Sequence, residues 1–218
     1  PSGVALIFVA ADGENSIAVA SGANASLTPR DIYNAEAAFV NADILVLQLE
    51  TPLETVRAAA ELAAEYKVRT ILNPAPAQPL PDDLWPHITL LTPNESEAEL
   101  LTGIRINSEA TAKEAAQVLL NKGVAAVLIT LGARGAFIAS GEYYQMAPGF
   151  PVTAIDTTAA GDVYNGALAV AFARGADLYK AVIYANAAAA LSVTRLGAQP
   201  SAPTAAEIEA FLAQQEIS

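Results

Sequence analysis

Short aliphatic segments alternate with alanine-rich segments along most of this chain, and this alternation restricts the possible folds more than any other feature of the sequence. The segments Asp43–Leu49, Val68–Leu72 and Val124–Thr130 consist mainly of aliphatic and β-branched residues, which is typical of buried strands. The alanine-rich segments Thr55–Tyr66 and Thr111–Lys122 have the length and composition of helices. Strands that alternate with helices of ordinary length form βαβ units. The sequence therefore predicts an α/β fold with a mostly parallel sheet.

The same patterns place further elements along the chain. A hairpin is expected near the N-terminus, where the strands Val4–Val9 and Ser16–Ala20 flank turn residues at Asp12–Asn15. Because this hairpin precedes the alternating pattern, we expect it to form an appendage. Thr28 and Pro29 are typical of a helix start. The remaining expected elements are a strand at Ile88–Leu91, a helix after Thr92–Glu97, a hairpin-like pair before a strand at Phe150–Ile155, and helices from Gly161 to about Arg174, from Leu178 to about Val193 and from Thr204 to Ala213.

The composition narrows the classes of partner. Asp and Glu number 23 against 11 Lys and Arg, which gives a net charge of −12. A nucleic-acid partner is not expected, because phosphate backbones need a basic surface. The chain has no cysteine, and therefore no disulfide and no thiolate metal site. Since no apolar run reaches the roughly 18 residues of a membrane span, a cytoplasmic protein without a membrane partner is expected.

The stretch Asp156–Asp162 places small residues and two carboxylates at an expected strand-to-helix turn. Ala160 and Gly161 stand where the first backbone N–H groups of the following helix have no intrahelical partner, so a phosphate can approach these groups closely. Asp162 stands beside this anion site and can accept a proton from a hydroxyl that attacks a phosphoryl group. An Asp that merely caps the helix explains the local pattern equally well.

Five motifs, in one order along the chain, resemble the ribokinase family of carbohydrate kinases. The stretch Asp156–Asp162, followed by Asn165-Gly166-Ala167, is similar to the C-terminal signature of that family, in which many members have Gly in place of Ala159. The other motifs are Asn73–Pro76, Thr92–Gly103, Thr130–Gly135 and Thr194–Ser201. The resemblance implies a three-layer α/β/α fold in a single ribokinase-like domain at 1–218, with a lid hairpin at 1–22 and a nucleotide-binding and catalytic core at 23–218.

The resemblance also implies roles for individual residues. Asp162 is expected to be the catalytic base that activates a sugar hydroxyl, and the N–H groups of Ala160 and Gly161 to form the anion hole for the γ-phosphoryl group. Glu50 matches a contact to sugar hydroxyls, with a solvated loop glutamate as the alternative. Gly132 and Gly135 also fit an ordinary turn, and Asn186 also fits a polar position on an apolar helix. The implied ATP-binding positions are Asn94, Thr130, Leu131, Gly132, Ala133, Arg134, Gly135, Gly161 and Asn186.

Two cation sites are implied in the same way, so that the expected cofactors are ATP, Mg²⁺ and K⁺. Asn94 and Glu97 match an Asn-x-x-Glu pair that takes part in the magnesium–phosphate network through water, although their spacing also fits a helix capping box. The potassium site involves carboxylate, hydroxyl and backbone carbonyl oxygens, which suit a hard cation. Its implied positions are Asp156, Thr158, Ser192, Arg195, Gly197 and Ser201.

The activity that the resemblance implies is ATP-dependent phosphorylation of D-ribose to D-ribose 5-phosphate, by a homodimer that pairs through the lid. The family has an N-terminal segment with the first core strands and a Gly-Gly motif that grips the sugar, and nothing in this chain, which begins at Pro1, matches it. We therefore expect an uncovered sheet edge, and little or no kinase activity from these 218 residues alone. The alternatives are a kinase for another sugar or a nucleoside, and an inactive fragment that binds nucleotide.

Overall fold

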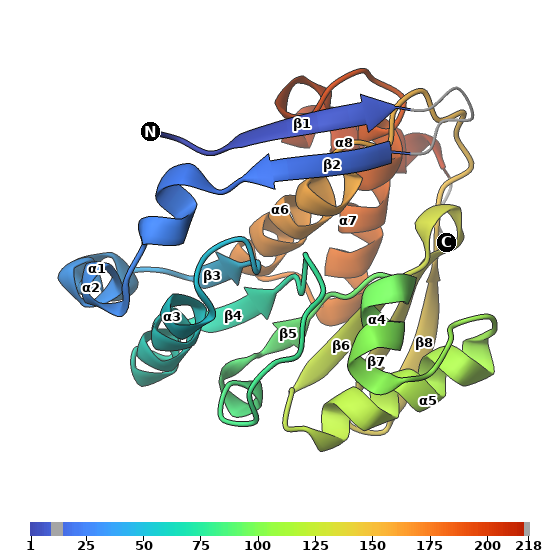
Figure 1. The fold of residues 1–218 in the computed structure, drawn as a ribbon. Coiled ribbons are helices and arrows are strands. Elements are labelled where there is room, and N and C mark those ends of the chain that lie inside the picture. Colours follow the sequence, from blue (N-terminus) through green and yellow to red (C-terminus); the bar gives the residue numbers. More distant parts are fainter. Residues whose placement is uncertain (10–14, 216–218) are drawn as a thin grey trace.

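A six-stranded sheet forms the centre of the computed structural model, which describes residues 1–9 and 15–215 (Figure 1). Neighbouring strands from β3 to β6 are parallel, whereas β6 pairs antiparallel with β7 and β7 with β8. The predicted, mostly parallel sheet is thus confirmed, and β7 and β8 are the expected hairpin-like pair. The strands lie in the order β3 (Ile44–Leu47), β4 (Arg69–Leu72), β5 (Leu90–Leu91), β6 (Ala126–Thr130), β7 (Gly135–Ser140) and β8 (Tyr143–Pro148).

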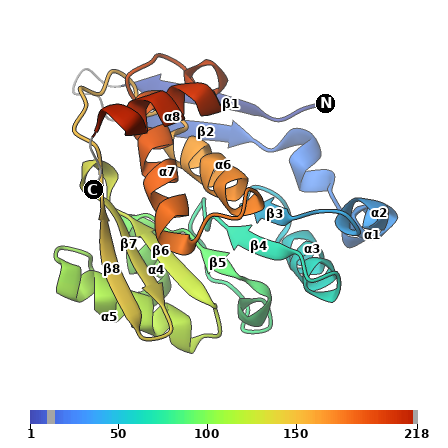
Figure 2. The ribbon, with the colours of Figure 1, turned by 180° about the vertical axis from the view of Figure 1, so that it is seen from behind.

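Helices cover both faces of this sheet, as Figures 1 and 2 show from opposite sides. The helices on one face are α3 (Leu53–Glu65), α4 (Glu95–Thr102) and α5 (Glu109–Asn121). The helices on the other face are α6 (Ala160–Ala173), α7 (Leu178–Ser192) and α8 (Ala205–Gln214). The short helices α1 (Pro29–Asn34) and α2 (Glu36–Phe39) lie next to α3. The chain forms the expected three layers, and within its described part no helix is long and apolar enough to cross a bilayer.

Among the described residues, two large apolar cores fill the spaces between the sheet and its helices, and a smaller third cluster contains Phe39, Ala59, Leu62, Ala63 and Val68. Successive residues of β6 alternate between the two large cores, because Val127 and Ile129 face the core with α3, α4 and α5, while Leu128 faces the core with α6, α7 and α8. All three side chains are fully buried. A strand that is covered on both faces carries apolar residues on both. This explains why the segment is a continuous aliphatic run in the sequence.

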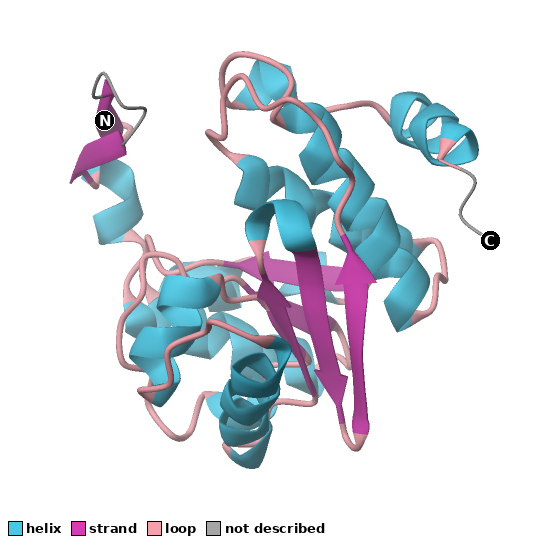
Figure 3. Ribbon diagram, turned by 90° about the vertical axis from the view of Figure 1, so that its right-hand side faces the viewer, coloured by secondary structure: helices cyan, strands magenta, loops and turns pink. Residues whose placement is uncertain are grey.

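The predicted N-terminal hairpin is confirmed. Its strands β1 (Val4–Val9) and β2 (Asn15–Ala20) pair antiparallel, and in the described residues neither pairs with a strand of the central sheet. Figure 3 shows the hairpin standing apart from the helical layers, beyond a connection that includes the 3₁₀ helix η1 (Gly22–Ser26). The Thr55 hydroxyl in α3 anchors the end of this connection by donating to the Leu27 carbonyl at 2.8 Å. The expected turn residues 12–14 lie outside the described residues.

The prediction of a strand at Phe150–Ile155 is wrong. These residues follow the end of β8 and form an irregular connection to α6. Pro151 has no N–H group for a ladder hydrogen bond. The N–H groups of Ile155 and Asp156 donate instead to the Val193 carbonyl, at 2.7 and 3.1 Å. The connection is therefore held by the end of α7 and not by a neighbouring strand.

The other predicted strands and helices are confirmed, with ends that differ by a few residues. The helix expected at Thr28–Pro29, for example, begins at Pro29, and the Asp31 carboxylate accepts the Thr28 N–H at 2.9 Å. The expected open edge is also present in the part of the chain that the structure describes, where β3 pairs only with β4. Val46 in this edge strand is 45% exposed.

Candidate active site

The N-terminus of α6 holds the small residues of the Asp156–Asp162 stretch. Ala159, the residue before the helix, has a left-handed backbone with φ 60° and ψ 14°. The Ala160 N–H group makes a long hydrogen bond of 3.2 Å to the Thr157 carbonyl, and the N–H groups of Gly161 and Asp162 have no acceptor among the described residues. Nothing lies within 4 Å of the place that a Cβ on Gly161 would take. The helix therefore presents unpaired donors at an accessible end, which favours an anion.

A cavity of about 360 Å³ opens beside this helix end. Ala160 and Gly161 form part of its wall, and α7 contributes Asn186. Asn186 also donates to the Pro148 carbonyl at 3.0 Å, which fixes its side chain. The volume is typical of a small-molecule site. The end of β6, the start of β7 and the loop between them contribute four of the predicted nucleotide positions, which are Thr130, Gly132, Ala133 and Gly135.

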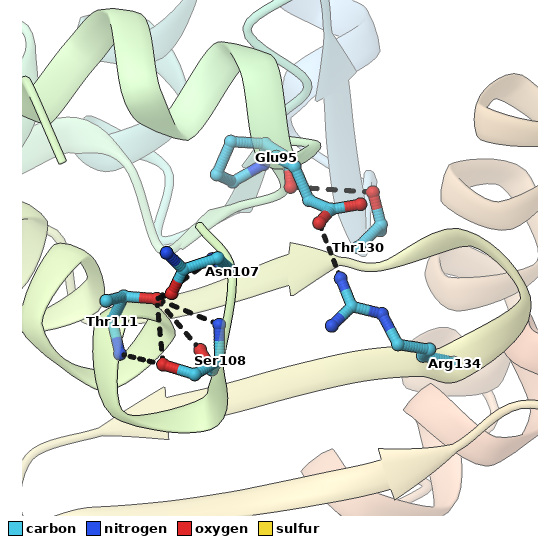
Figure 4. A network of polar contacts seen from close by, with 7 residues as sticks. Glu95, Asn107, Ser108, Thr111, Thr130 and Arg134 are labelled. Atoms are coloured by element: carbon cyan, nitrogen blue, oxygen red, sulfur yellow. Dashed lines mark hydrogen bonds and ion pairs between the residues drawn. The ribbon is translucent and has the colours of Figure 1, made fainter. Parts of the chain in front are cut away.

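The other three predicted nucleotide positions, Asn94, Leu131 and Arg134, do not line this cavity. Leu131 is buried in the apolar core. The Arg134 guanidinium points towards α4, where its Nη2 lies 2.5 Å from the Glu95 carboxylate (Figure 4). Both side chains are exposed, so this ion pair contributes little to stability. The Thr130 hydroxyl, which is labelled in Figure 4, donates to the Pro93 carbonyl at 3.5 Å.

Asn94 and Glu97 form the capping box that their spacing predicted. The Glu97 N–H donates to Asn94 Oδ1 at 2.8 Å, and the Asn94 N–H and Nδ2 donate to the two Glu97 oxygens at 2.8 and 2.9 Å. Burial raises the pKa of the Glu97 carboxyl group, and the bond from the Asn94 N–H opposes this rise. No cluster of three or more Asp, Glu, His or Cys suited to a metal lies within 1–9 and 15–215. Magnesium fits here through water, because this ion keeps several waters and needs few protein ligands.

Asp162 lies close enough to Glu50, which is predicted to contact the same substrate, for the charge of Glu50 to act on it. The pKa of the Asp162 carboxyl group is raised, first by its partial burial and second by the negative charge of Glu50. The Asp162 residue is exposed to solvent, which weakens both influences. Glu50 follows β3, and its N–H donates to Gln48 Oε1 at 2.6 Å. The structure thus packs β3 against α6 and brings Glu50, just after β3, within electrostatic reach of the first turn of α6.

The Asp156 carboxylate joins two loops that are far apart in the sequence. It accepts the Thr158 N–H at 2.9 Å and the Gly197 N–H at 2.8 Å. These hydrogen bonds lower its pKa, with the bond from Gly197 as the largest cause. The Asp156 side chain is therefore held as an anion at the point where the two loops meet.

Several backbone carbonyl oxygens near Asp156 accept no hydrogen bond from the described residues and can therefore bind a cation. These are the carbonyl oxygens of Thr158, Arg195 and Gly197. In contrast, the Ser192 carbonyl accepts the Arg195 N–H at 3.0 Å, and the Ser201 hydroxyl donates to the Ala198 carbonyl at 2.7 Å. Unpaired carbonyl oxygens beside a carboxylate suit a hard cation. This part of the structure fits the predicted potassium site.

The cavity also has apolar walls that sequence reasoning missed. Phe150, Val152, Tyr164 and Val193 all line it. Aromatic and aliphatic residues are typical of a core, so these four carried no signal of a binding site. Phe150 and Val152 reach the cavity because the connection between β8 and α6 runs along it instead of continuing the sheet, whereas Tyr164 comes from α6 and Val193 from the end of α7.

Comparisons with known proteins identify the class of this fold and site. The family model described as pfkB family carbohydrate kinase matches residues 1–205. The chain is 46% identical over 211 residues to a ribokinase of Haemophilus influenzae, which covers 97% of this chain and 69% of that relative.

Two solved structures are similar in both fold and sequence. A ribokinase from Thermotoga maritima superposes with a TM-score of 0.88 at 41% identity, over 98% of this chain and 70% of the other. An Arabidopsis thaliana ribokinase complexed with ribose and ATP gives a TM-score of 0.89 at 32% identity, over 100% and 70%. The protein is a carbohydrate kinase and thus a phosphotransferase. The chain belongs to the pfkB family, and the relatives named here are ribokinases.

Proposed function

We propose that the residues of this site serve the ATP-dependent phosphorylation of the terminal hydroxyl of D-ribose, which forms D-ribose 5-phosphate and ADP, in the whole natural protein. The observation that carries this proposal is the place of Asp162, beside unpaired N–H groups at the start of α6 and under the influence of Glu50. Phosphoryl transfer to a hydroxyl requires a proton acceptor next to an anion site. The Arabidopsis relative, complexed with ribose and ATP, supports both substrates.

In this proposal Asp162 accepts the proton of the sugar hydroxyl as the hydroxyl oxygen attacks the γ-phosphorus of ATP. The new phosphorus–oxygen bond forms as the bond to the β-phosphate oxygen breaks, and ADP leaves with that electron pair. The N–H groups of Ala160 and Gly161 donate to the oxygens of the transferring group, where they stabilise negative charge in the transition state. The Ala160 N–H gives up its long bond to Thr157 for this purpose.

The cavity beside α6 is the proposed ATP site. The phosphates lie along the loop at 130–135 in this proposal, and Asn186 borders the base. Magnesium, when bound with ATP, neutralises phosphate charge, and Asn94 and Glu97 hold it through water. A cytoplasmic homodimer that pairs through the lid hairpin completes the proposal. The proposed potassium site consists of Asp156, Thr158, Ser192, Arg195, Gly197 and Ser201.

Replacing Asp162 by Asn in the whole natural protein tests the base. We expect kcat to fall by roughly 10²–10⁴-fold, because proton transfer loses its acceptor. Affinity for ATP, measured by calorimetry, should stay unchanged. Asp177→Asn is the matched control, since Asp177 caps α7 by accepting the Lys180 N–H at 2.9 Å and Asn is an equally good cap. Turnover by Asp162→Asn at the level of this control would show that the base is another group.

Substrate assays separate the proposal from its alternatives. Steady-state rates with D-ribose, deoxyribose, other sugars and nucleosides distinguish a ribose kinase from a kinase of another specificity. ATP binding without turnover on any of these substrates would instead favour a nucleotide-binding protein without catalysis. In that case the residues around Asp162 would bind an anion without catalysing phosphoryl transfer.

A further inference from the structure

A buried polar contact between Thr92 and Asn165 lies directly behind the proposed catalytic turn. Thr92 follows β5 and is 2% exposed, and Asn165 lies in α6 and is 5% exposed. The Thr92 hydroxyl donates to Asn165 Oδ1 at 2.7 Å, and Asn165 Nδ2 donates to the Gly161 carbonyl at 2.9 Å. Burial of polar groups is unfavourable unless hydrogen bonds compensate for it. Since both groups are paired, the contact imposes a defined geometry.

Thr92 is itself attached to the sheet. Its N–H donates to the Leu72 carbonyl at the end of β4, at 3.0 Å. Its hydroxyl lies 3.3 Å from the same carbonyl, but one hydroxyl proton serves one acceptor at a time, and the contact to Asn165 is shorter. The amide orientation of Asn165 follows, because only its NH₂ group can pair with the Gly161 carbonyl. A continuous series of contacts therefore joins the sheet to the second residue of α6.

These contacts end on the peptide group between Gly161 and Asp162. In an α-helix the Gly161 carbonyl also accepts the backbone N–H of Asn165, so this oxygen accepts two donors. Two donors on one carbonyl polarise the peptide group and strengthen its N–H as a donor. That N–H belongs to Asp162 and has no acceptor in the described part of the chain. The contact thus holds the Asp162 backbone and strengthens a donor beside the anion site.

We propose that Thr92 and Asn165 are positioning residues for phosphoryl transfer, an inference that rests on the proposed function of the α6 N-terminus. They set the first turn of α6 relative to the carboxyl edge of the sheet, so that Asp162 and the free N–H groups are aligned. Apolar contacts of small side chains such as Ala167 and Ala171 are not directional and do not set this alignment. A displacement of about 1 Å is enough to slow such a reaction strongly.

The substitution Thr92→Val, made in the whole natural protein, removes the hydroxyl at almost unchanged size. We expect kcat to fall about tenfold or more, and the KM values for ATP and sugar to change little, because the binding surfaces stay intact. Thr92→Ser keeps the hydroxyl and should restore most of kcat. Thr70→Val is the matched control, since Thr70 is fully buried in β4 and its hydroxyl has no hydrogen-bond partner among the described residues.

Two kinetic results would overturn the proposal. The first is a kcat for Thr92→Val equal to that of Thr70→Val, and the second is a loss in Thr92→Ser as large as that in Thr92→Val. Thermal unfolding establishes that each variant is folded.

Hydrogen exchange provides a readout that does not need turnover. We expect the backbone amides at 163–166, in the first turns of α6, to exchange faster in Thr92→Val than in Thr70→Val. Equal exchange in the two variants would count against the positioning role. If the unchanged protein phosphorylates no sugar, the proposed function fails, whereas the exchange result still decides whether Thr92 holds this turn.

Discussion

At the scale of single residues, the pKa of the Asp162 carboxyl group is subject to opposing influences. The N-terminus of α6 favours the anion, whereas partial burial and the charge of Glu50 raise its pKa. A raised pKa makes a carboxylate a stronger proton acceptor, as long as the group is ionised at the working pH. Glu50 therefore contributes to the base strength of Asp162, besides its proposed contact to the sugar.

The substitution Glu50→Gln tests this influence. It removes a neighbouring negative charge, so the pKa of Asp162 should fall. A base works when deprotonated, and kcat/KM therefore declines as pH drops through that pKa. In the variant we expect this acidic decline to begin at a lower pH, as measured by pH–rate profiles. Glu54→Gln, at an exposed position in the first turn of α3, is the control. An unchanged or higher onset in Glu50→Gln would contradict the assignment.

At the scale of elements, α6 differs from its neighbours in how it begins. The helices α4, α5, α7 and α8 each follow a residue whose side chain accepts a backbone N–H of the first turn. Figure 4 shows this arrangement for α5, where Ser108 accepts the Thr111 N–H at 3.2 Å. The residue before α6 is Ala159, which has no side-chain oxygen and a positive φ. The helix thus leaves its donors free for a ligand, at a cost in stability.

The left-handed backbone of Ala159 leads to a prediction about stability. We expect Ala159→Gly to raise the free energy of unfolding by about 0.5–1 kcal/mol, because glycine avoids the strain of positive φ and loses only part of this gain to its greater freedom when unfolded. The adjacent Ala160→Gly, inside the helix, should lower it by up to about 1 kcal/mol. Urea unfolding measures both variants. Effects of the same sign would mean that the Ala159 backbone is not strained.

At the scale of the whole molecule, the structure consists of a three-layer body and a hairpin that stands apart (Figure 3). All three apolar clusters of the described residues lie within the body. Among the described residues, β1 and β2 pair only with each other. The folding stability of the body should therefore depend little on the hairpin, whereas a lid that covers the sugar should affect sugar binding.

Replacement of residues 4–20 by a short Gly/Ser linker tests whether the hairpin affects sugar binding without affecting folding stability. We expect the midpoint of thermal unfolding to stay unchanged and the KM for the sugar to rise. Leu128→Ala provides the contrasting control, because loss of this fully buried side chain should lower the free energy of unfolding by about 2–5 kcal/mol. A clearly lower midpoint after removal of the hairpin would show that the hairpin is part of the cooperative unit.

Composition, periodicity and residue spacing allowed most helices and strands to be predicted. The limits of these local signals also explain why the strand predicted at Phe150–Ile155 is wrong. Helices and strands followed from composition and periodicity, and the Asn94–Glu97 capping box followed from spacing. The strand expected at Phe150–Ile155 failed because aliphatic content does not reveal where backbone N–H groups find acceptors. Here the acceptor is the Val193 carbonyl at the end of α7, a contact between segments that are distant in the sequence.

The sequence by itself determined the α/β class, the small residues at the start of α6 and the carboxylate in its first turn, since each depends on neighbouring residues. Only the tertiary structure decided which distant groups meet that turn. It placed Glu50 within electrostatic reach of Asp162, Gly197 on the Asp156 carboxylate, and the Thr92 hydroxyl on Asn165. These encounters depend on how layers and loops pack, and backbone carbonyls and buried hydroxyls carry no pattern along the chain. For this reason the proposed base was visible in the sequence, whereas the contacts that tune and position it were not.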